Sequence, residues 1–328
     1  MTEKRRWRAY VAIFVAMAFV SAVATSVAIM TFENFACRTQ PHGSDDFLAY
    51  CRSSRYGDYE HGALYYGVEP AVRDRIRNAQ VLILGDSQTQ ASFSSKAVRA
   101  YFGKFGIRFF LLGFGYAERS TFSLAILKRW KASPKVLVIM VDPFFSDNLS
   151  EPAQEALEGR PAFLWRLALK FLFQRVHRVL CFSAPLVCSE SEPVILRSAR
   201  DGQWNWIGPY IAERVVPVDE KAQKWTIKPE EFERARDLGE MFLREVGLNR
   251  RCVVLTGTPI ESTWSEFAQK LAAALQTNSI FLSIEGLSTV DGGHLNLQSA
   301  ERWSREFVEA LTPILQTCIP AVSGPLPP

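Results

Sequence analysis

Residues 81–87 read VLILGDS, a run of four apolar residues followed by Gly-Asp-Ser. A short apolar run that ends at a glycine is typical of a strand buried on both faces of a parallel sheet. In open α/β sheets, binding and catalytic sites form at the carboxyl ends of the strands. This pattern predicts that Ser87 lies at such an end, before a helix. Gly-Asp-Ser is also an ordinary turn with a helix cap, so the motif alone does not establish a nucleophile.

Apolar runs alternate with amphipathic segments along the rest of the chain. The strand candidates are residues 80–84, 107–112, 135–141, 251–255 and 279–284, and the helix candidates are residues 94–102, 120–130, 229–246, 261–275 and 297–311. This alternation predicts an α/β fold with a doubly wound, mostly parallel sheet of about five strands and helices on both faces. We expect the domain to span residues 78–315, with a helical insertion at about 146–228 and a Pro-rich tail at 316–328.

The N-terminal segment predicts a membrane anchor. Residues 10–30 carry no charge, and as a helix they would be about 30 Å long, close to the thickness of a bilayer core. Four basic residues lie within residues 1–9, which indicates that this tip stays in the cytoplasm and that the rest is exported. We therefore expect a single-pass protein of the inner (cytoplasmic) membrane, with its domain on the periplasmic or extracytoplasmic side and an irregular, polar neck at 31–77.

A second interpretation of this segment remains open. Ala22-Val23-Ala24 resembles a signal-peptidase site, and cleavage after Ala24 would release the domain. The apolar run continues to Met30, which is longer than a cleaved signal needs and favours retention.

The charge of the chain argues against nucleic acid as a partner. The formal net charge is +4, and the first eight residues contribute +3 of it. A nucleic-acid-binding protein concentrates excess Lys and Arg on its folded surface, which this chain does not. The histidines are too scattered for a metal site, and no Gly-rich phosphate loop is present, so neither a metal nor another cofactor is expected.

The six cysteines agree with an exported location. Cys37 with Cys51, and Cys181 with Cys188, are close enough in sequence to close short disulfide loops in an oxidising compartment. Cys252 opens an apolar run and is either a small buried residue or the partner of Cys318.

The four histidines include one that stands out. His294 lies in the sequence VDGGHLN, after the last strand candidate and before the last helix candidate. Asp291 precedes it by three residues, so both side chains can lie on one face of a loop. A serine nucleophile needs a base within hydrogen-bond reach, and the base needs an acid to orient it. Ser87 and the Asp291–His294 pair, at opposite ends of the α/β array, provide these three groups.

On these motifs the chain resembles the SGNH (GDSL-type) hydrolase superfamily, over roughly residues 78–312 with the insertion unmatched. The resemblance implies a flavodoxin-like three-layer sandwich in which Ser87 attacks an ester carbonyl, His294 takes its proton and Asp291 orients His294. It also implies oxyanion donors: the Ser87 amide, a glycine after the second strand and an asparagine after the third. Gly115, or alternatively Gly113, matches the glycine. The asparagine block is missing, because Val141 is followed by Asp142 and Pro143.

Further residues are candidates for contact with substrate. Asp86 and Asp142 follow the first and third strand candidates. Trp204, Asn205 and Trp206 combine aromatic rings with an amide, which suits a sugar ring, although they could equally pack a lid.

We therefore expect an exported, membrane-anchored serine esterase or O-acyl (acetyl) transferase acting on acylated glycans. Exported relatives of this superfamily that modify polysaccharides often have similarly divergent middle blocks. The alternative is a catalytically weak binding or assembly subunit that works with membrane partners in polysaccharide synthesis. Hydrolysis and transfer share one acyl-serine intermediate, so the sequence does not separate them.

Overall fold

The computed structural model describes most of the chain. The described residues are 3–31, 43, 45–51, 58–115, 118–141, 144–183, 194–207, 215–218, 228–257, 260 and 262–320.

A five-stranded parallel sheet forms the centre of the domain, as the apolar runs predict. Its strand order is β3-β2-β4-β8-β9. The strands are β2 (Val81–Asp86), β3 (Phe109–Phe114), β4 (Val136–Met140), β8 (Val253–Thr256) and β9 (Asn278–Ser279). All residues of β2, β3, β4 and β8 are buried. Burial on both faces explains why these strands are continuously apolar and do not alternate.

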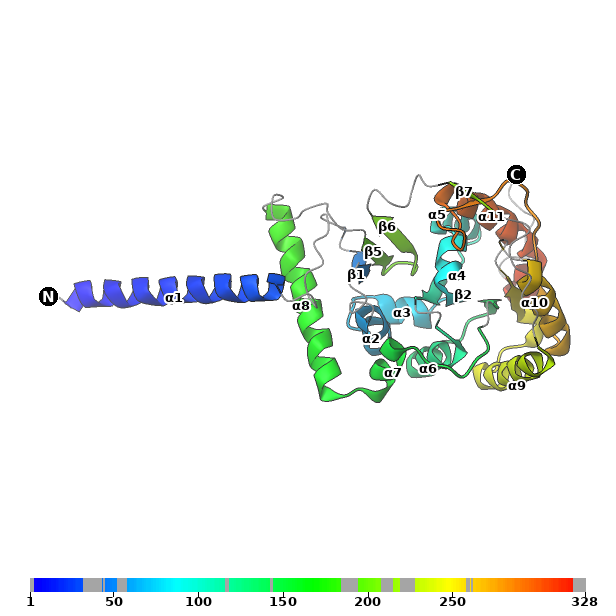
Figure 1. The fold of residues 1–328 in the computed structure, drawn as a ribbon, viewed down its shortest axis with the longest axis horizontal. Coiled ribbons are helices and arrows are strands. Elements are labelled where there is room, and N and C mark those ends of the chain that lie inside the picture. Colours follow the sequence, from blue (N-terminus) through cyan, green and yellow to red (C-terminus); the bar gives the residue numbers. More distant parts are fainter. Residues whose placement is uncertain are drawn as a thin grey trace.

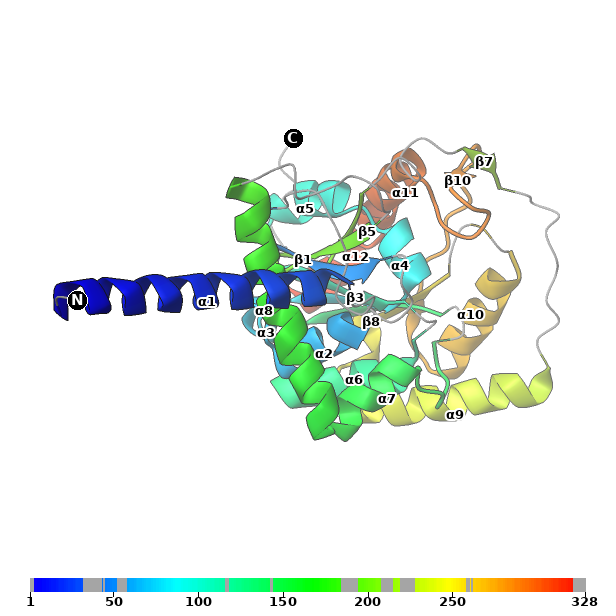
Figure 2. The ribbon, with the colours of Figure 1, turned by 60° about the vertical axis from the view of Figure 1, so that its left-hand side comes forward.

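Helices cover both faces of this sheet (Figure 2). Leu82 and Leu84 of β2 point into the core that is shared with α6 (Ser120–Trp130), α9 (Pro229–Val246) and α10 (Ser262–Ala274). Val81 and Ile83 point to the opposite face and into a second core. That core is shared with α5 (Ser95–Gly103), α11 (Leu297–Ala310) and α12 (Thr312–Cys318). The described residues therefore form an α/β domain of three layers.

The segment expected to be an irregular neck is instead part of the domain. It contains β1 (Asp46–Cys51), α2 (Asp58–Tyr66) and α3 (Val72–Arg77). Tyr59 and Leu64 on α2 are fully buried. The sequence predicts a short helix near Pro70–Asn78, which α3 confirms, but the prediction that the residues before it are irregular was wrong for β1 and α2, because the polar residues of α2 have buried partners. One of them, Glu60, forms an ion pair of 2.6 Å with Arg197, and both side chains are inaccessible to solvent.

Within its described residues, the insertion after β4 is helical in its first half and contains strands in its second. It begins with α7 (Glu151–Glu158) and α8 (Pro161–Ser183) and continues with β5 (Val194–Ser198), β6 (Trp204–Ile207) and β7 (Val216–Pro217). β5 lies between β1 and β6 in an antiparallel sheet, and β7 pairs with β10 (Ser288–Thr289). The expected helical insertion is corrected accordingly. Its strands are two to five residues long, and Arg197, Ser198 and Asn205 interrupt their apolar residues, so they lack the unbroken apolar run that marks strands such as β4.

The insertion also covers the outer edge of the central sheet at β3. The Leu111 amide donates to the Asp201 carbonyl at 2.8 Å. The Arg197 guanidinium donates to the Leu111 carbonyl at 2.7 Å and to the Gly113 carbonyl at 2.9 Å. The backbone of β3 is thus bonded to the insertion on the side away from β2.

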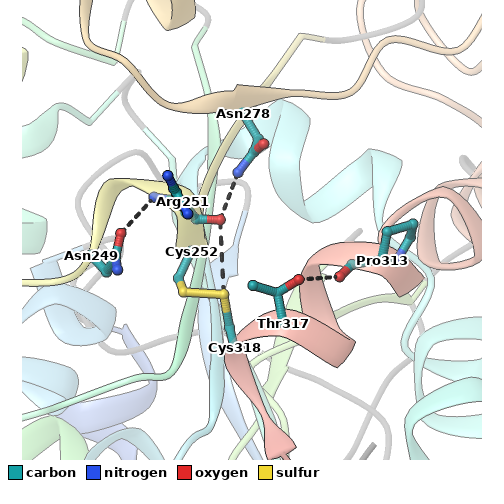
Figure 3. The surroundings of a disulfide bond; sticks show 7 residues. All are labelled: Asn249, Arg251, Cys252, Asn278, Pro313, Thr317 and Cys318. Atoms are coloured by element: carbon teal, nitrogen blue, oxygen red, sulfur yellow. Dashed lines mark hydrogen bonds between the residues drawn. A yellow bond between two sulfur atoms is a disulfide. The ribbon is translucent and has the colours of Figure 1, made fainter. Parts of the chain in front are cut away.

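A single disulfide joins two described cysteines, Cys252 and Cys318 (Figure 3). It links the short helix η3 (Arg250–Cys252), just before β8, to the end of α12. This settles the pairing that the sequence left open. Cys181 is also disulfide-bonded. Its expected partner Cys188 lies outside the described residues, as does Cys37.

Helix α1 (Glu3–Thr31) extends away from the domain (Figure 1). Its segment Trp7–Ala24 is long and apolar enough to cross a membrane, and none of it is buried. This helix is compatible with a membrane anchor and with a signal sequence.

Candidate active site

Ser87 is the first residue of a short helix, α4 (Ser87–Ser92), that follows β2 without a connecting loop. Gly85 makes this abrupt change of direction possible. Its φ is +154°, and a Cβ atom at this position would lie 1.9 Å from Thr89 Oγ1. Asp86 then caps the helix, because its carboxylate accepts the amide of Gln88 at 2.9 Å. The local sequence thus holds the Ser87 side chain at the carboxyl end of the sheet.

Asp86 was a candidate for contact with substrate, and the structure gives it this capping role instead. Its carboxylate is buried and lies 4.0 Å from the Arg119 guanidinium. Burial raises the pKa of Asp86, and the Gln88 amide and Arg119 act in the opposite direction.

His294 lies in a tight loop between β10 and α11. The amide of Val290 donates to the His294 carbonyl at 2.8 Å, which closes the loop. Gly292 has a φ of +92°, a conformation that favours glycine, and its amide donates to Thr289 Oγ1 at 2.9 Å. The loop therefore turns back on itself and presents His294 toward the start of α4.

The three chemically important side chains meet at this point. His294 Nε2 lies 3.0 Å from Ser87 Oγ, and His294 Nδ1 lies 2.8 Å from Asp291 Oδ2. Asp291 Oδ1 also accepts the backbone amides of Gly293 and His294, both at 2.9 Å. The hydrogen bond from His294 lowers the pKa of Asp291 to about 2, against the opposing effect of partial burial.

This arrangement can support nucleophilic catalysis. A carboxylate bound to Nδ1 keeps a proton on that nitrogen, which leaves the Nε2 lone pair to accept the proton of the Ser87 hydroxyl. The same carboxylate stabilises the imidazolium that forms when the proton moves.

The two candidate oxyanion glycines have different surroundings. Gly113 lies inside β3, opposite Gly85 of β2, and a Cβ atom there would lie 2.6 Å from the Asp86 carbonyl oxygen. Close packing therefore accounts for glycine at this position. Gly115 lies just beyond β3, and its amide donates to the Tyr50 hydroxyl at 3.1 Å. An oxyanion would have to displace Tyr50 to use this amide.

On β6, Asn205 points to the face opposite Trp204 and Trp206, because successive side chains of a strand alternate between its faces; the centroids of the two indole rings lie 5.9 Å apart on the same face. Trp204 is buried, and its indole N–H donates to Glu60 at 2.7 Å. This indole is therefore a packed structural group and not an open sugar platform. Asn205 is exposed, with its amide nitrogen 3.4 Å from Asp46 Oδ1. Trp206 lies with its ring centroid 6.0 Å from that of His294. Asp142 is outside the described residues.

A cleft of about 600 Å³ opens beside His294. Its walls come from the residues around α4 and α5, from β6, and from the His294 loop, and they include Phe93, Ser95, Lys96, Arg99, Trp206 and Leu295. The two basic side chains on this list are paired: Lys96 with Glu301 at 3.1 Å, and Arg99 with Asp201. The cleft therefore combines apolar surface with basic side chains whose charges are neutralised by acidic partners.

Gln90, which the sequence did not single out, connects the helix that carries Ser87 to β3 and β6. It lies three residues after Ser87 on α4. Its side-chain amide donates to the Gly113 carbonyl at 3.1 Å, and its side-chain oxygen accepts the Trp204 amide at 2.9 Å. Gln203 donates to the Gln90 carbonyl at 2.9 Å. These bonds fix β6, and with it Trp206, against the helix that carries Ser87. The sequence contains only a weak signal for this role, the presence of an amide one helical turn after the serine.

A second His–carboxylate pair is fully buried. His61 Nε2 lies 3.2 Å from Glu118, whose carboxylate also bonds Ser150. Although burial alone would raise the pKa of Glu118, the hydrogen bonds and charge from His61 and Ser150 lower it. His61 contacts the rings of Phe114 and Phe122. This pair connects α2 to the segment after β3.

Comparison of the chain with protein-family models, with curated proteins and with solved structures found no match. Among the described residues, no cluster of three or more His, Cys, Asp or Glu side chains could hold a metal ion. An assignment of function to this chain therefore depends on the arrangement of its own residues.

Proposed function

We propose that this protein is a membrane-anchored serine esterase or O-acyltransferase of the SGNH type that acts on acylated glycans outside the cytoplasm. The observation that carries the proposal is the chain of hydrogen bonds from Ser87 through His294 to Asp291. Ser87, at the start of α4, and His294, in the loop before α11, are 207 residues apart in sequence, and they meet at the carboxyl edge of a parallel sheet.

The proposed reaction has two stages. Ser87 Oγ attacks the ester carbonyl while His294 Nε2 takes the hydroxyl proton, and a tetrahedral intermediate forms. His294 then gives this proton to the departing sugar oxygen as the ester bond breaks, which leaves an acyl group on Ser87. In the second stage, water or the hydroxyl of another sugar attacks the acyl-serine, and His294 again takes and returns the proton. Water gives hydrolysis, and a sugar hydroxyl gives transfer.

Two features support a glycan as the substrate. The cleft beside His294 combines the exposed part of the Trp206 ring with amide and hydroxyl groups, which suits the apolar face and the hydroxyls of a sugar ring. The apolar helix α1 and the basic residues in its first turns support a location on the extracytoplasmic side of a membrane.

A second candidate function is favoured by the oxyanion region. The sequence has Asp142 and Pro143 where the superfamily places an asparagine donor, and the Gly115 amide is bonded to Tyr50. Loss of one oxyanion donor typically lowers kcat by about 10²–10³. A weak catalyst of this kind would fit a binding or assembly subunit of a polysaccharide-synthesis complex.

Labelling with a fluorophosphonate probe separates the two functions, because the probe reacts only with an activated serine. We expect one label per chain, located on the peptide that contains Ser87. Ser87→Ala should abolish labelling, whereas Ser283→Ala, at an exposed loop position, should retain it. A folded wild-type protein that takes up no label would reject the esterase proposal and favour the binding subunit.

A further inference from the structure

Helix α8 exposes a continuous apolar face. Its large exposed apolar side chains are Leu164, Trp165, Leu172, Val176, Val179 and Phe182. Leu172, Val176, Val179 and Phe182 recur at intervals of three or four residues, and Trp165 lies seven residues, or two helical turns, before Leu172, which places them along one side of a helix. Trp165 is 67% exposed and Phe182 is 86% exposed, values that are unusual for such large apolar groups in a folded domain.

The opposite face of α8 is packed against the domain. Phe163 and Leu167 are buried, and a Cβ atom at Gly62 of α2 would lie within 3 Å of both side chains. Lys170 and Gln174 are buried on the same face, and the Gln174 side-chain oxygen accepts the Leu48 amide at 2.8 Å. The rotation of α8 about its axis is therefore fixed, and its apolar side is held outward.

The charges on α8 are all of one sign. Its 23 residues include Arg166, Lys170, Arg175 and Arg178 and contain no Asp or Glu. Arg166 and Arg175 remain partly exposed beside the apolar face while they pair with Glu155 and Glu69 at 2.7 and 3.0 Å. An apolar face flanked by basic residues is typical of helices that lie in the interface of a membrane containing anionic lipids.

The position of α8 relative to α1 agrees with such an interface. In both views the last turns of α1 lie beside the middle of α8, and α8 runs across the direction of α1 (Figures 1 and 2). If α1 crosses a bilayer, a helix that runs crosswise at its end lies along the bilayer surface. Only 14 residues separate Thr31 from Asp46, a length that reaches at most about 50 Å.

We propose that α8 lies flat on the bilayer that holds α1, with its apolar face in the boundary between headgroups and acyl chains. The occupant of this face is an anionic phospholipid surface, and the arginines beside it contact the headgroups. The inference rests on the proposed anchoring by α1. Helix α11, which follows the His294 loop and contributes to the wall of the cleft, lies on the side of the domain away from α8 (Figure 1). The attachment would therefore hold the cleft toward the aqueous phase.

Photocrosslinking in the full chain tests this proposal. The protein is reconstituted in nanodiscs of phosphatidylethanolamine and phosphatidylglycerol, with p-benzoylphenylalanine in place of Leu172 or, in a second variant, Phe182. The matched control carries the same group in place of Met241, a similarly exposed residue on α9. After irradiation, mass spectrometry should find phospholipid adducts on the α8 peptide of both variants and none on the α9 peptide of the control.

Each other result has a defined meaning. Adducts that are absent from α8, or equally frequent at position 241, would overturn the proposal while leaving the anchor in place. A crosslink from α8 to a second copy of the chain would show that a dimer covers this face, and would also overturn it. Recovery of the protein in the soluble fraction without residues 1–24 would remove both the anchor and this inference. None of these outcomes bears on Ser87, whose fluorophosphonate labelling is measured separately.

Discussion

Asp291 contacts His294 through both of its carboxylate oxygens: Oδ2 lies 2.8 Å from the ring Nδ1, and Oδ1 accepts the His294 backbone amide at 2.9 Å. The second bond fixes the position of the carboxylate relative to the loop before any substrate binds. Because the imidazole is held at Nδ1, rotation of the ring away from Ser87 would break a charge-assisted hydrogen bond. The loop that contains both residues therefore orients the imidazole ring through its own hydrogen bonds.

The first prediction concerns the role of this carboxylate in catalysis. Asp291→Asn should lower kcat for a small acetyl ester by about 10⁴, by analogy with the serine-protease triad, because an amide favours the wrong imidazole tautomer. Asp237→Asn, an exposed position on α9, is the matched control and should leave kcat unchanged. A kcat in the Asp291 variant close to that of the wild type would remove Asp291 from the mechanism.

The second prediction concerns stability at low pH. The pKa of Asp291 is lowered from 3.8 to about 2 in the folded protein, chiefly by the hydrogen bond from His294. A group with a lowered folded-state pKa stabilises the fold above its unfolded pKa, and this contribution is lost as the pH falls from about 4 to about 2. The free energy of unfolding in urea should therefore differ between wild type and Asp291→Asn at about pH 5, and the difference should shrink toward about pH 2. The effect is small, because the carboxylate is half exposed. A constant difference across this range would contradict the assignment.

The third prediction addresses the Gly115 amide. If this amide binds the oxyanion, the Tyr50 hydroxyl competes for it, and Tyr50→Phe should leave kcat at the wild-type value or raise it. The ring and its packing against Trp204 are retained in this variant, so the fold is expected to persist. Steady-state hydrolysis of a small acetyl ester provides the measurement. A fall in kcat of about tenfold or more would instead indicate that the tyrosine hydroxyl itself contacts the substrate.

The fourth prediction concerns the disulfide between Cys252 and Cys318. The two residues are 66 apart in sequence, and the enclosed segment contains both Asp291 and His294. Replacement of both cysteines by serine should lower the free energy of unfolding by about 4 kcal/mol, because the unfolded chain gains the entropy of an open loop. Urea denaturation of oxidised wild type and of the double variant measures this difference. A loss below about 1 kcal/mol would mean that this link adds little to the stability of the domain.

Strands β2, β3, β4 and β8 could be predicted because they are short, apolar and buried on both faces. β9 differs: it is Asn278–Ser279, polar and not buried, and the strand predicted at 279–284 overlaps it only at Ser279. The contact between Asp291 and His294 could also be predicted from their spacing, because a loop of five residues brings the two side chains together without contacts to distant parts of the sequence. The elements that were missed depend on partners far away in the sequence. Glu60 and His61 make the sequence of α2 look polar, although both residues are buried in the structure. Glu60 pairs with Arg197 and His61 pairs with Glu118, and no local pattern in the sequence reveals either pairing.

The roles of the tryptophans could not be separated for a related reason. The positions of the two tryptophans follow from the folding of this segment as β6 next to β5: both indoles lie on one face of the strand, with Trp204 bonded to Glu60 and Trp206 beside His294. A prediction that treats this segment as a turn contains no such arrangement. Likewise, nothing in the sequence around Gly115 indicates that Tyr50, 65 residues earlier, would occupy its amide.

The cover over β3 has a consequence for how copies of this protein behave toward one another. β3 is an outer strand of the central sheet, and the free backbone of such a strand is a template on which another chain can add a strand. Here the Leu111 amide and the Leu111 and Gly113 carbonyls are already bonded to Asp201 and Arg197. A neighbouring molecule therefore has no free backbone hydrogen-bonding groups along this part of β3 on which to add a strand. The insertion that shapes the cleft thus also protects this strand from edge-to-edge aggregation.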